Sequence, residues 1–99
     1  MHEHGLAKEL WPQLQQIAAS KRLGRVYRVE MIVGMLHGVT ADFLAHSFEH
    51  AFEGSSFEGA VMTIRIVDPG QAYTPPGASE PVVAGGWELL VTALEGSEI

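Results

Sequence analysis

The first four residues, Met1-His2-Glu3-His4, gather several nitrogen donors in a short stretch of chain. A free α-amine, the next peptide nitrogens and the His2 imidazole close small chelate rings around one cation. Nitrogen ligands packed this tightly favour late first-row ions that accept a square-planar field, above all nickel(II) and copper(II). The sequence therefore predicts a metal site at the amino-terminal end, against the alternative that His2 is an exposed terminal histidine.

The other histidines offer weaker arrangements. His4 is an axial ligand, a helix cap or a solvated side chain, and the last of these is the interpretation we favour. His46 and His50 are four residues apart, a spacing at which a helix turns two imidazoles toward one zinc or nickel ion. The pair lies opposite the apolar stripe of its predicted helix, so a solvated polar face is favoured there too.

Composition narrows the classes of function. The 99 residues form one domain, 1–99, and contain no cysteine, which excludes thiolate catalysis and Cys-ligated zinc. A net charge of -6 with only six Lys and Arg argues against a nucleic-acid partner. No apolar run suits a membrane span and no signal peptide is recognised, so a cytoplasmic location is expected. The serines lack any nucleophile motif, and we expect no enzyme.

Two helices are predicted from apolar residues at helical spacing. The first runs from Leu6 to Lys21, with Pro12 as a conflict that either kinks the helix or delays its start. Gly24 is predicted to lie just past its end. The second helix follows Thr40, a good N-cap residue, and runs to about Phe52.

Three strands are predicted. The first, Arg25 to Leu36, alternates so that its core-facing residues are Tyr27, Val29, Met31, Val33 and Met35. The second spans Ala60 to Asp68, with Met62, Ile64 and Ile66 on one face and Thr63 and Arg65 on the other. The last spans Trp87 to Glu95, with Trp87, Leu89, Val91 and Ala93 on one side. Four prolines and four glycines between Asp68 and Gly86 predict a loop over 69–86.

The element order α-β-α-β-β predicts an α+β fold, with two helices packed on one face of a three-stranded mixed sheet. The first two strands flank a helix, so a right-handed crossover makes them parallel if they are neighbours. The opposite sheet face then exposes Val61, Val67, Leu90 and Leu94. These residues form either a partner surface, such as a homodimer interface, or scattered surface apolar side chains. Trp11 and Trp87 are interpreted as packing residues.

Short motifs follow one another along the chain with a distinctive order and spacing. They are Met1-His2-Glu3; Arg25-Val26, Val29, Gly34 and Leu36; Val39, Asp42 and Leu44; Phe48-Glu49, Gly54-Ser55, Glu58-Gly59-Ala60 and Met62; and Gly86, Glu88 and Leu89. In this order they resemble the HypA/HybF family of nickel-insertion accessory proteins of hydrogenase maturation.

The resemblance implies a nickel-binding metallochaperone-like protein that serves a nickel enzyme, [NiFe] hydrogenase above all and urease as another client. It implies nickel(II) bound by Met1 through its α-amine, by His2 through its imidazole and backbone nitrogen, and by Glu3 through its backbone nitrogen. It also implies a HypB-type GTPase and a hydrogenase large-subunit precursor as partners.

The chain departs from the family between its last two strands, where members carry a zinc lobe built on two C-x-x-C pairs. A Pro/Gly-rich loop over 69–86 replaces that lobe here, so we expect no zinc subdomain and no structural zinc. This loss favours an alternative function, a protein-interaction scaffold that has kept the fold but no longer delivers metal.

Overall fold

The computed structural model describes the backbone of residues 2–99 and the side chains of residues 5–99. Its elements, in chain order, are α1 (His2–Ser20), β1 (Leu23–Gly34), the short 3-10 helix η1 (Met35–His37), α2 (Ala41–Phe52), β2 (Val61–Val67), β3 (Ala72–Tyr73), β4 (Val82–Val83) and β5 (Leu89–Glu98).

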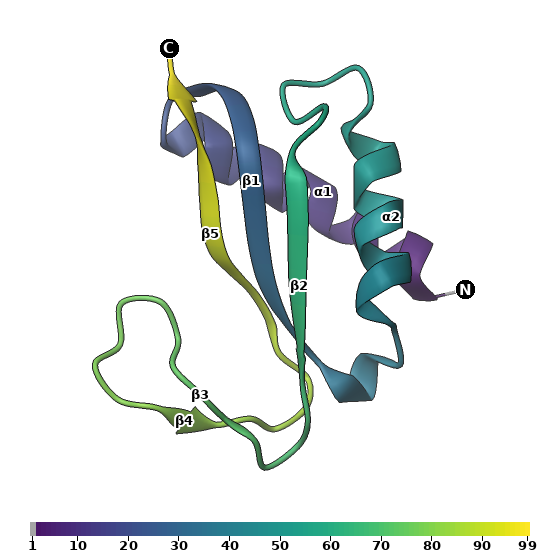
Figure 1. Cartoon of the computed structure of the whole chain (residues 1–99), viewed down its shortest axis with the longest axis vertical. Coiled ribbons are helices and arrows are strands. Elements are labelled where there is room, and N and C mark those ends of the chain that lie inside the picture. The colour runs from purple at the N-terminus through teal and green to yellow at the C-terminus, as the bar shows by residue number, and fades with distance from the viewer. Residues whose placement is uncertain (1) are drawn as a thin grey trace.

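The three long strands form one mixed sheet in the order β2-β1-β5. β1 and β2 are parallel, as the crossover through α2 predicts, and β5 runs antiparallel to β1. In Figure 1, α1 passes behind the sheet and α2 lies beside β2; both helices pack into one core with the sheet, so they cover a single face of it. The predicted α+β fold is confirmed.

α1 is longer than the sequence predicts. It begins at His2 and passes through Pro12, which is exposed and does not end the helix. Water can take the place of the missing N–H partner on an exposed face, which lowers the cost of the proline. The helix closes at Arg22, whose φ of 59° is left-handed, and not at Gly24, which lies within β1.

The main core lies between the helices and the sheet. Leu10 and Leu14 of α1 meet Leu44, Phe48 and Phe52 of α2 there, all of them buried. Half-buried Trp11 packs its ring against Phe52 and Phe57, with centroid distances of 5.4 and 4.8 Å. Trp11 is therefore a packing residue, as predicted.

Register shifts between β1 and β5 overturn part of the predicted alternation. β1 carries an extra residue between Val26 and Arg28, so Val26 faces the core and Tyr27 is 56% exposed. β5 carries an extra residue between Val91 and Ala93, which turns Leu94 into the main core at 2% exposure. A bulge moves every later side chain to the other face, which a strict period of two does not anticipate.

The predicted exposure of Val61, Val67, Leu90 and Leu94 on the other sheet face is wrong for most of these residues. The bulges are one reason, and a cover over that face is the second. Leu94 faces inward, and Val67 is fully buried in a second apolar cluster with Ile32, Tyr73 and Ala84. Leu90 packs against that cluster, which leaves only Val61 exposed, at 60%. These residues do not form the continuous exposed surface suggested for a homodimer.

The segment between β2 and β5 covers the apolar residues on the outer face of the sheet. It was predicted as a loop, but β3 and β4 pair antiparallel within it, Ala72 with Val83 and Tyr73 with Val82. Hydrogen bonds from Gly70 N to Ala84 O and from Ala84 N to Gln71 O, both 2.8 Å, tie its two halves together. The hairpin lies at the lower end of the sheet in Figure 1. Strands of two residues are too short to show a periodicity in sequence.

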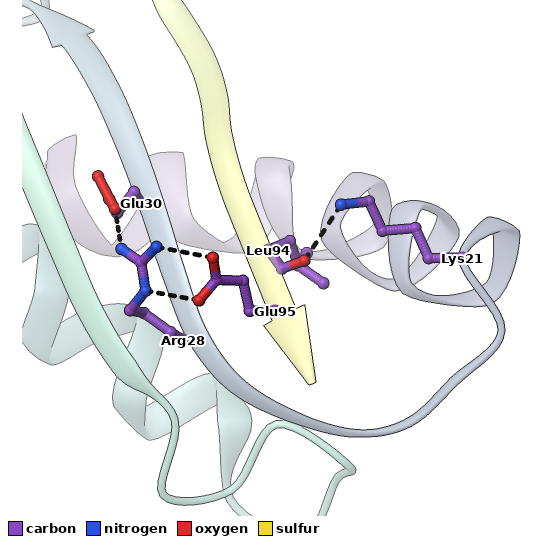
Figure 2. A network of polar contacts seen from close by, with 5 residues as sticks. All are labelled: Lys21, Arg28, Glu30, Leu94 and Glu95. Carbon is purple, nitrogen blue, oxygen red and sulfur yellow. Dashed lines mark hydrogen bonds and ion pairs between the residues drawn. The ribbon is translucent and has the colours of Figure 1, made fainter. Parts of the chain in front are cut away.

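Beyond the hairpin, charged residues occupy the outer face of the sheet. The Arg28 guanidinium donates two 2.9 Å hydrogen bonds to the Glu95 carboxylate and also pairs with Glu30 (Figure 2). Lys21 Nζ donates to the Leu94 carbonyl at the free edge of β5, 3.2 Å away (Figure 2). A lysine on an edge strand discourages pairing with another chain. Neither helix of the described residues is long and apolar enough to cross a membrane.

Candidate metal site and its surroundings

The predicted ligands are only partly described. Met1 and the side chains of His2, Glu3 and His4 lie outside the described residues. The backbone of α1 is helical from His2 onward. Because the first four N–H groups of a helix have no carbonyl partner within it, the amide nitrogens of His2 and Glu3 give up no helical hydrogen bond when they bind an ion.

Gly5 makes the first turn of α1 easier to open. It is exposed, and a methyl group placed on it would meet no atom within 4 Å. Glycine within a helix is less stable than alanine by roughly 0.5–1 kcal/mol, because it loses more backbone freedom on folding. Gly5 therefore lowers the cost of unwinding the helix next to the candidate ligands. Such unwinding is required if backbone nitrogens are to lie in one plane around an ion.

α2 runs beside the start of α1. Its N-cap is Thr40, whose Oγ1 accepts a 3.3 Å hydrogen bond from Phe43 N, as the sequence predicts. Phe43 itself is 66% exposed, although its place in the apolar stripe predicted burial. A shallow apolar depression separates the two helices, lined by Ala7, Lys8, Trp11, Ser47, His50 and Ala51.

The second pair of candidate ligands lies on the solvent side of α2. His46 and His50 are both exposed, which agrees with the solvated polar face that the sequence favoured. His50 Nδ1 lies 3.6 Å from Glu53 Oε1. Within the part of the chain whose side chains are described, no three His, Asp or Glu residues converge as a metal cage.

Several motif residues have a structural role that the sequence alone did not show. A Cβ on Gly34 would lie 2.1 Å from the carbonyl carbon of Gly86, so these two glycines let η1 and the start of β5 pack backbone to backbone. The Glu88 carboxylate accepts hydrogen bonds from Gly85 N and Gly86 N, at 2.8 and 2.9 Å. These donors, Gly85 first, hold the pKa of Glu88 below its usual value.

Trp87, predicted to pack in the core, is 64% exposed beside this joint. Its carbonyl oxygen lies 3.0 Å from His37 Nε2, and its ring meets the His37 ring edge-on with centroids 5.3 Å apart. The Trp87 ring misses the core because β5 starts two residues later than predicted, at Leu89. The contact engages His37 with the backbone of Trp87.

The motif between α2 and β2 builds a tight connection. Ser55 Oγ donates to Phe52 O at 2.7 Å and accepts from Phe57 N at 3.0 Å. Gly59 has a φ of 81°, in the left-handed region that favours glycine. The motif therefore positions Phe57 under Trp11.

Residues 1–73 match the family model described as hydrogenase/urease nickel incorporation, metallochaperone, HypA. The chain belongs to the HypA family. The match ends at Tyr73, the last residue of β3.

Curated relatives carry the name hydrogenase maturation factor HypA. The factor of Nitrosospira multiformis is 34% identical over 64 residues, which cover 65% of this chain and 56% of that one. The factor of Azorhizobium caulinodans is 30% identical over 99 aligned residues, which cover 92% and 87% of the two chains. The chain thus spans little more than half the length of the first relative and most of the second.

The fold comparison agrees. The solution structure of the Ni metallochaperone HypA from Helicobacter pylori superposes with a TM-score of 0.70 over the full length of both chains, at 18% identity. At that identity the likeness concerns the fold alone.

Proposed function

We propose that this chain is a nickel carrier that serves the maturation of a nickel enzyme, most directly [NiFe] hydrogenase. The observation that carries the proposal is the family match, which includes Met1, His2 and Glu3 and is described as nickel incorporation. The proposed ligands are the Met1 α-amine, the His2 imidazole and backbone nitrogen, and the Glu3 backbone nitrogen. Residues 1–99 act as one domain in this proposal.

The donor chemistry suits cargo that must be released. An α-amine has a pKa of about 8 and an imidazole about 6.5, so both yield their protons to a metal near neutral pH. A bare cation at a helix N-terminus is disfavoured by roughly 0.3–1 kcal/mol, which ionised amide ligands and the Glu3 carboxylate offset. Opening the first turn of α1 breaks few helical hydrogen bonds, so the chain can both bind and release nickel at this end.

The partners follow from the same proposal. A HypB-type GTPase and a hydrogenase large-subunit precursor are the proteins with which nickel would be exchanged, in the cytoplasm. The chain itself would act by binding and transfer and not by catalysis. The hairpin of β3 and β4 would stabilise the sheet end by apolar packing, without structural zinc.

Nickel titration tests the carrier proposal. Protein whose amino-terminus is Met1 should show a ligand-field band on adding nickel(II), and His2→Ala should lose it. Acetylation of the Met1 α-amine should also abolish the band, because the amine can then no longer bind the ion. His4→Ala is the matched control and should retain the band.

Two results would contradict the proposal. Equal bands from wild type and His2→Ala would place nickel elsewhere. Absence of a band from the wild type would favour the alternative, an interaction scaffold of the same fold that does not deliver metal.

A further inference from the structure

The exposed face of α2 carries a metal-binding spacing that the amino-terminal site does not use. Residues 46–50 read His-Ser-Phe-Glu-His, and all five lie within the regular helix Ala41–Phe52. The pattern H-x-x-E-H is that of zinc-binding helices in a class of metallopeptidases, in which both histidines hold one ion. On a helix, side chains four residues apart lie about 5–6 Å from each other at Cβ, within chelating reach.

The surroundings of the two imidazoles favour a cation. Both side chains are exposed, so neither must leave the core to bind. Glu53 Oε1 lies 3.6 Å from His50 Nδ1, too far for a hydrogen bond, so it adds negative charge beside the ring without occupying a ring nitrogen. Asp42, Glu49 and Glu53 add negative charge on or next to α2, whose sequence contains no Lys or Arg.

One opposing charge faces the pair from the neighbouring helix. Lys8 lines the same depression as His50. Its side chain is exposed, and a lysine on such a surface keeps its ammonium group in water along a flexible stem. Lys8 therefore weakens the attraction for a cation without closing the approach to His46.

We propose that His46 and His50 form a second site for a divalent transition-metal ion, with water completing the coordination. Two imidazoles bind more weakly than a full cage of protein ligands, so this site holds an ion loosely. It stands on α2, across a shallow depression from Ala7 and Lys8, which follow the proposed amino-terminal ligands by one to two turns. The pair would bind nickel or zinc whether or not the amino-terminal site does.

The site is not expected to hydrolyse peptides. A zinc peptidase needs a third protein ligand, and among the side chains described no three such groups converge. Glu49 is therefore a neighbouring charge and not a catalytic base.

The double variant His2→Gln, His4→Gln isolates this site, because the amino-terminal chelate then has no imidazole. Calorimetric titration of this parent variant with nickel(II) should show one weak equivalent. In that background, His46→Gln and His50→Gln should each weaken binding by about tenfold or more, since a single imidazole remains at the site. His37→Gln is the matched control and should bind as the parent variant does.

Spacing supplies a sharper test than removal. The double variant His46→Gln, Glu49→His keeps the number of histidines but places them side by side, where they diverge around the helix. It should lose the site, whereas Glu49→Gln alone should keep it. Helix content measured by circular dichroism checks that all variants fold.

Zinc(II), which is diamagnetic, gives the second readout by NMR. The Nε2 resonances of His46 and His50 should move together on titration, while those of His37 stay in place. The proposal is overturned if the His2→Gln, His4→Gln variant binds no nickel, if removal of His46 or His50 from it leaves binding as tight, or if the two imidazoles respond independently.

Discussion

Truncation of Tyr73 to alanine should unfold the second apolar cluster and show what holds the hairpin onto the sheet. Tyr73 is 9% exposed and packs with Ile32, Val67 and Ala84 on the face away from the helices. Truncation of a buried large aromatic typically costs about 3–5 kcal/mol. The cluster is small and its neighbours relax easily, so we expect the lower end, about 3 kcal/mol.

For a domain of this size, that loss corresponds to a fall in Tm of roughly 12–24 °C, at about 4–8 °C for each kcal/mol. Total stability is expected to be only about 5–15 kcal/mol, so the change is readily measured. Thermal unfolding followed by circular dichroism is the assay. Wild-type unfolding should be the same with and without a zinc chelator, because apolar packing closes this end of the sheet.

Val83→Ala is the matched control, since Val83 lies in the same hairpin but is 71% exposed. It should change the free energy of unfolding by no more than about 0.5 kcal/mol. If Tyr73→Ala costs no more than Val83→Ala, the cluster does not anchor the hairpin and the account of the outer face is wrong.

Three further predictions concern local features. Arg22→Gly should raise the free energy of unfolding by roughly 0.5–1 kcal/mol, because a left-handed φ of 59° strains any residue with a Cβ. Arg22→Ala keeps that strain and should not stabilise the protein. Urea denaturation of the two variants is the measurement. Glu88→Gln should destabilise the protein near neutral pH and match the wild type in acid. A carboxyl whose pKa is lowered in the folded state stabilises the fold above its unfolded-state pKa, and this contribution is lost as the pH falls through the folded-state pKa. Unfolding measured at a series of pH values checks this, and an equal loss of stability at every pH would assign the effect to packing. Gly5→Ala should stabilise the first turn of α1 by roughly 0.5–1 kcal/mol. It should therefore slow nickel uptake, which stopped-flow absorbance measures. An unchanged rate of uptake would mean that the turn need not open.

Features that depend on neighbours in sequence were predictable. The N-cap of α2 joins the Thr40 hydroxyl to an amide three residues later, so the residue type at position 40 was enough to predict it. The parallel pairing of β1 and β2 followed from the handedness of a crossover, which does not depend on side-chain detail. Met62 faces the core as predicted because β2 contains no bulge.

Other features depend on which backbone segments meet. The bulges that expose Tyr27 and bury Leu94 arise where β1 and β5 pair across 60 or more residues of sequence. The sequence of neither strand indicates the extra residue. The sequence placed the start of α1 at Leu6, its first apolar residue, whereas the helix begins at His2; the sequence also did not show that Pro12 faces water. The structural purpose of Gly34 appeared only with Gly86 against it.

The candidate sites divide in the same way. The amino-terminal donors and the histidine spacing on α2 are local patterns of residue types, so the order of amino acids was enough to identify them, and the motif order identified the family. Whether an apolar residue is a partner surface or core depends on what covers it, and no local pattern carries that information. Val67 and Leu90 were candidates for a partner surface until Tyr73 and Ala84, brought over by the hairpin, were found to pack with them. Burial is a property of contacts between distant segments, which is why it had to come from the folded chain.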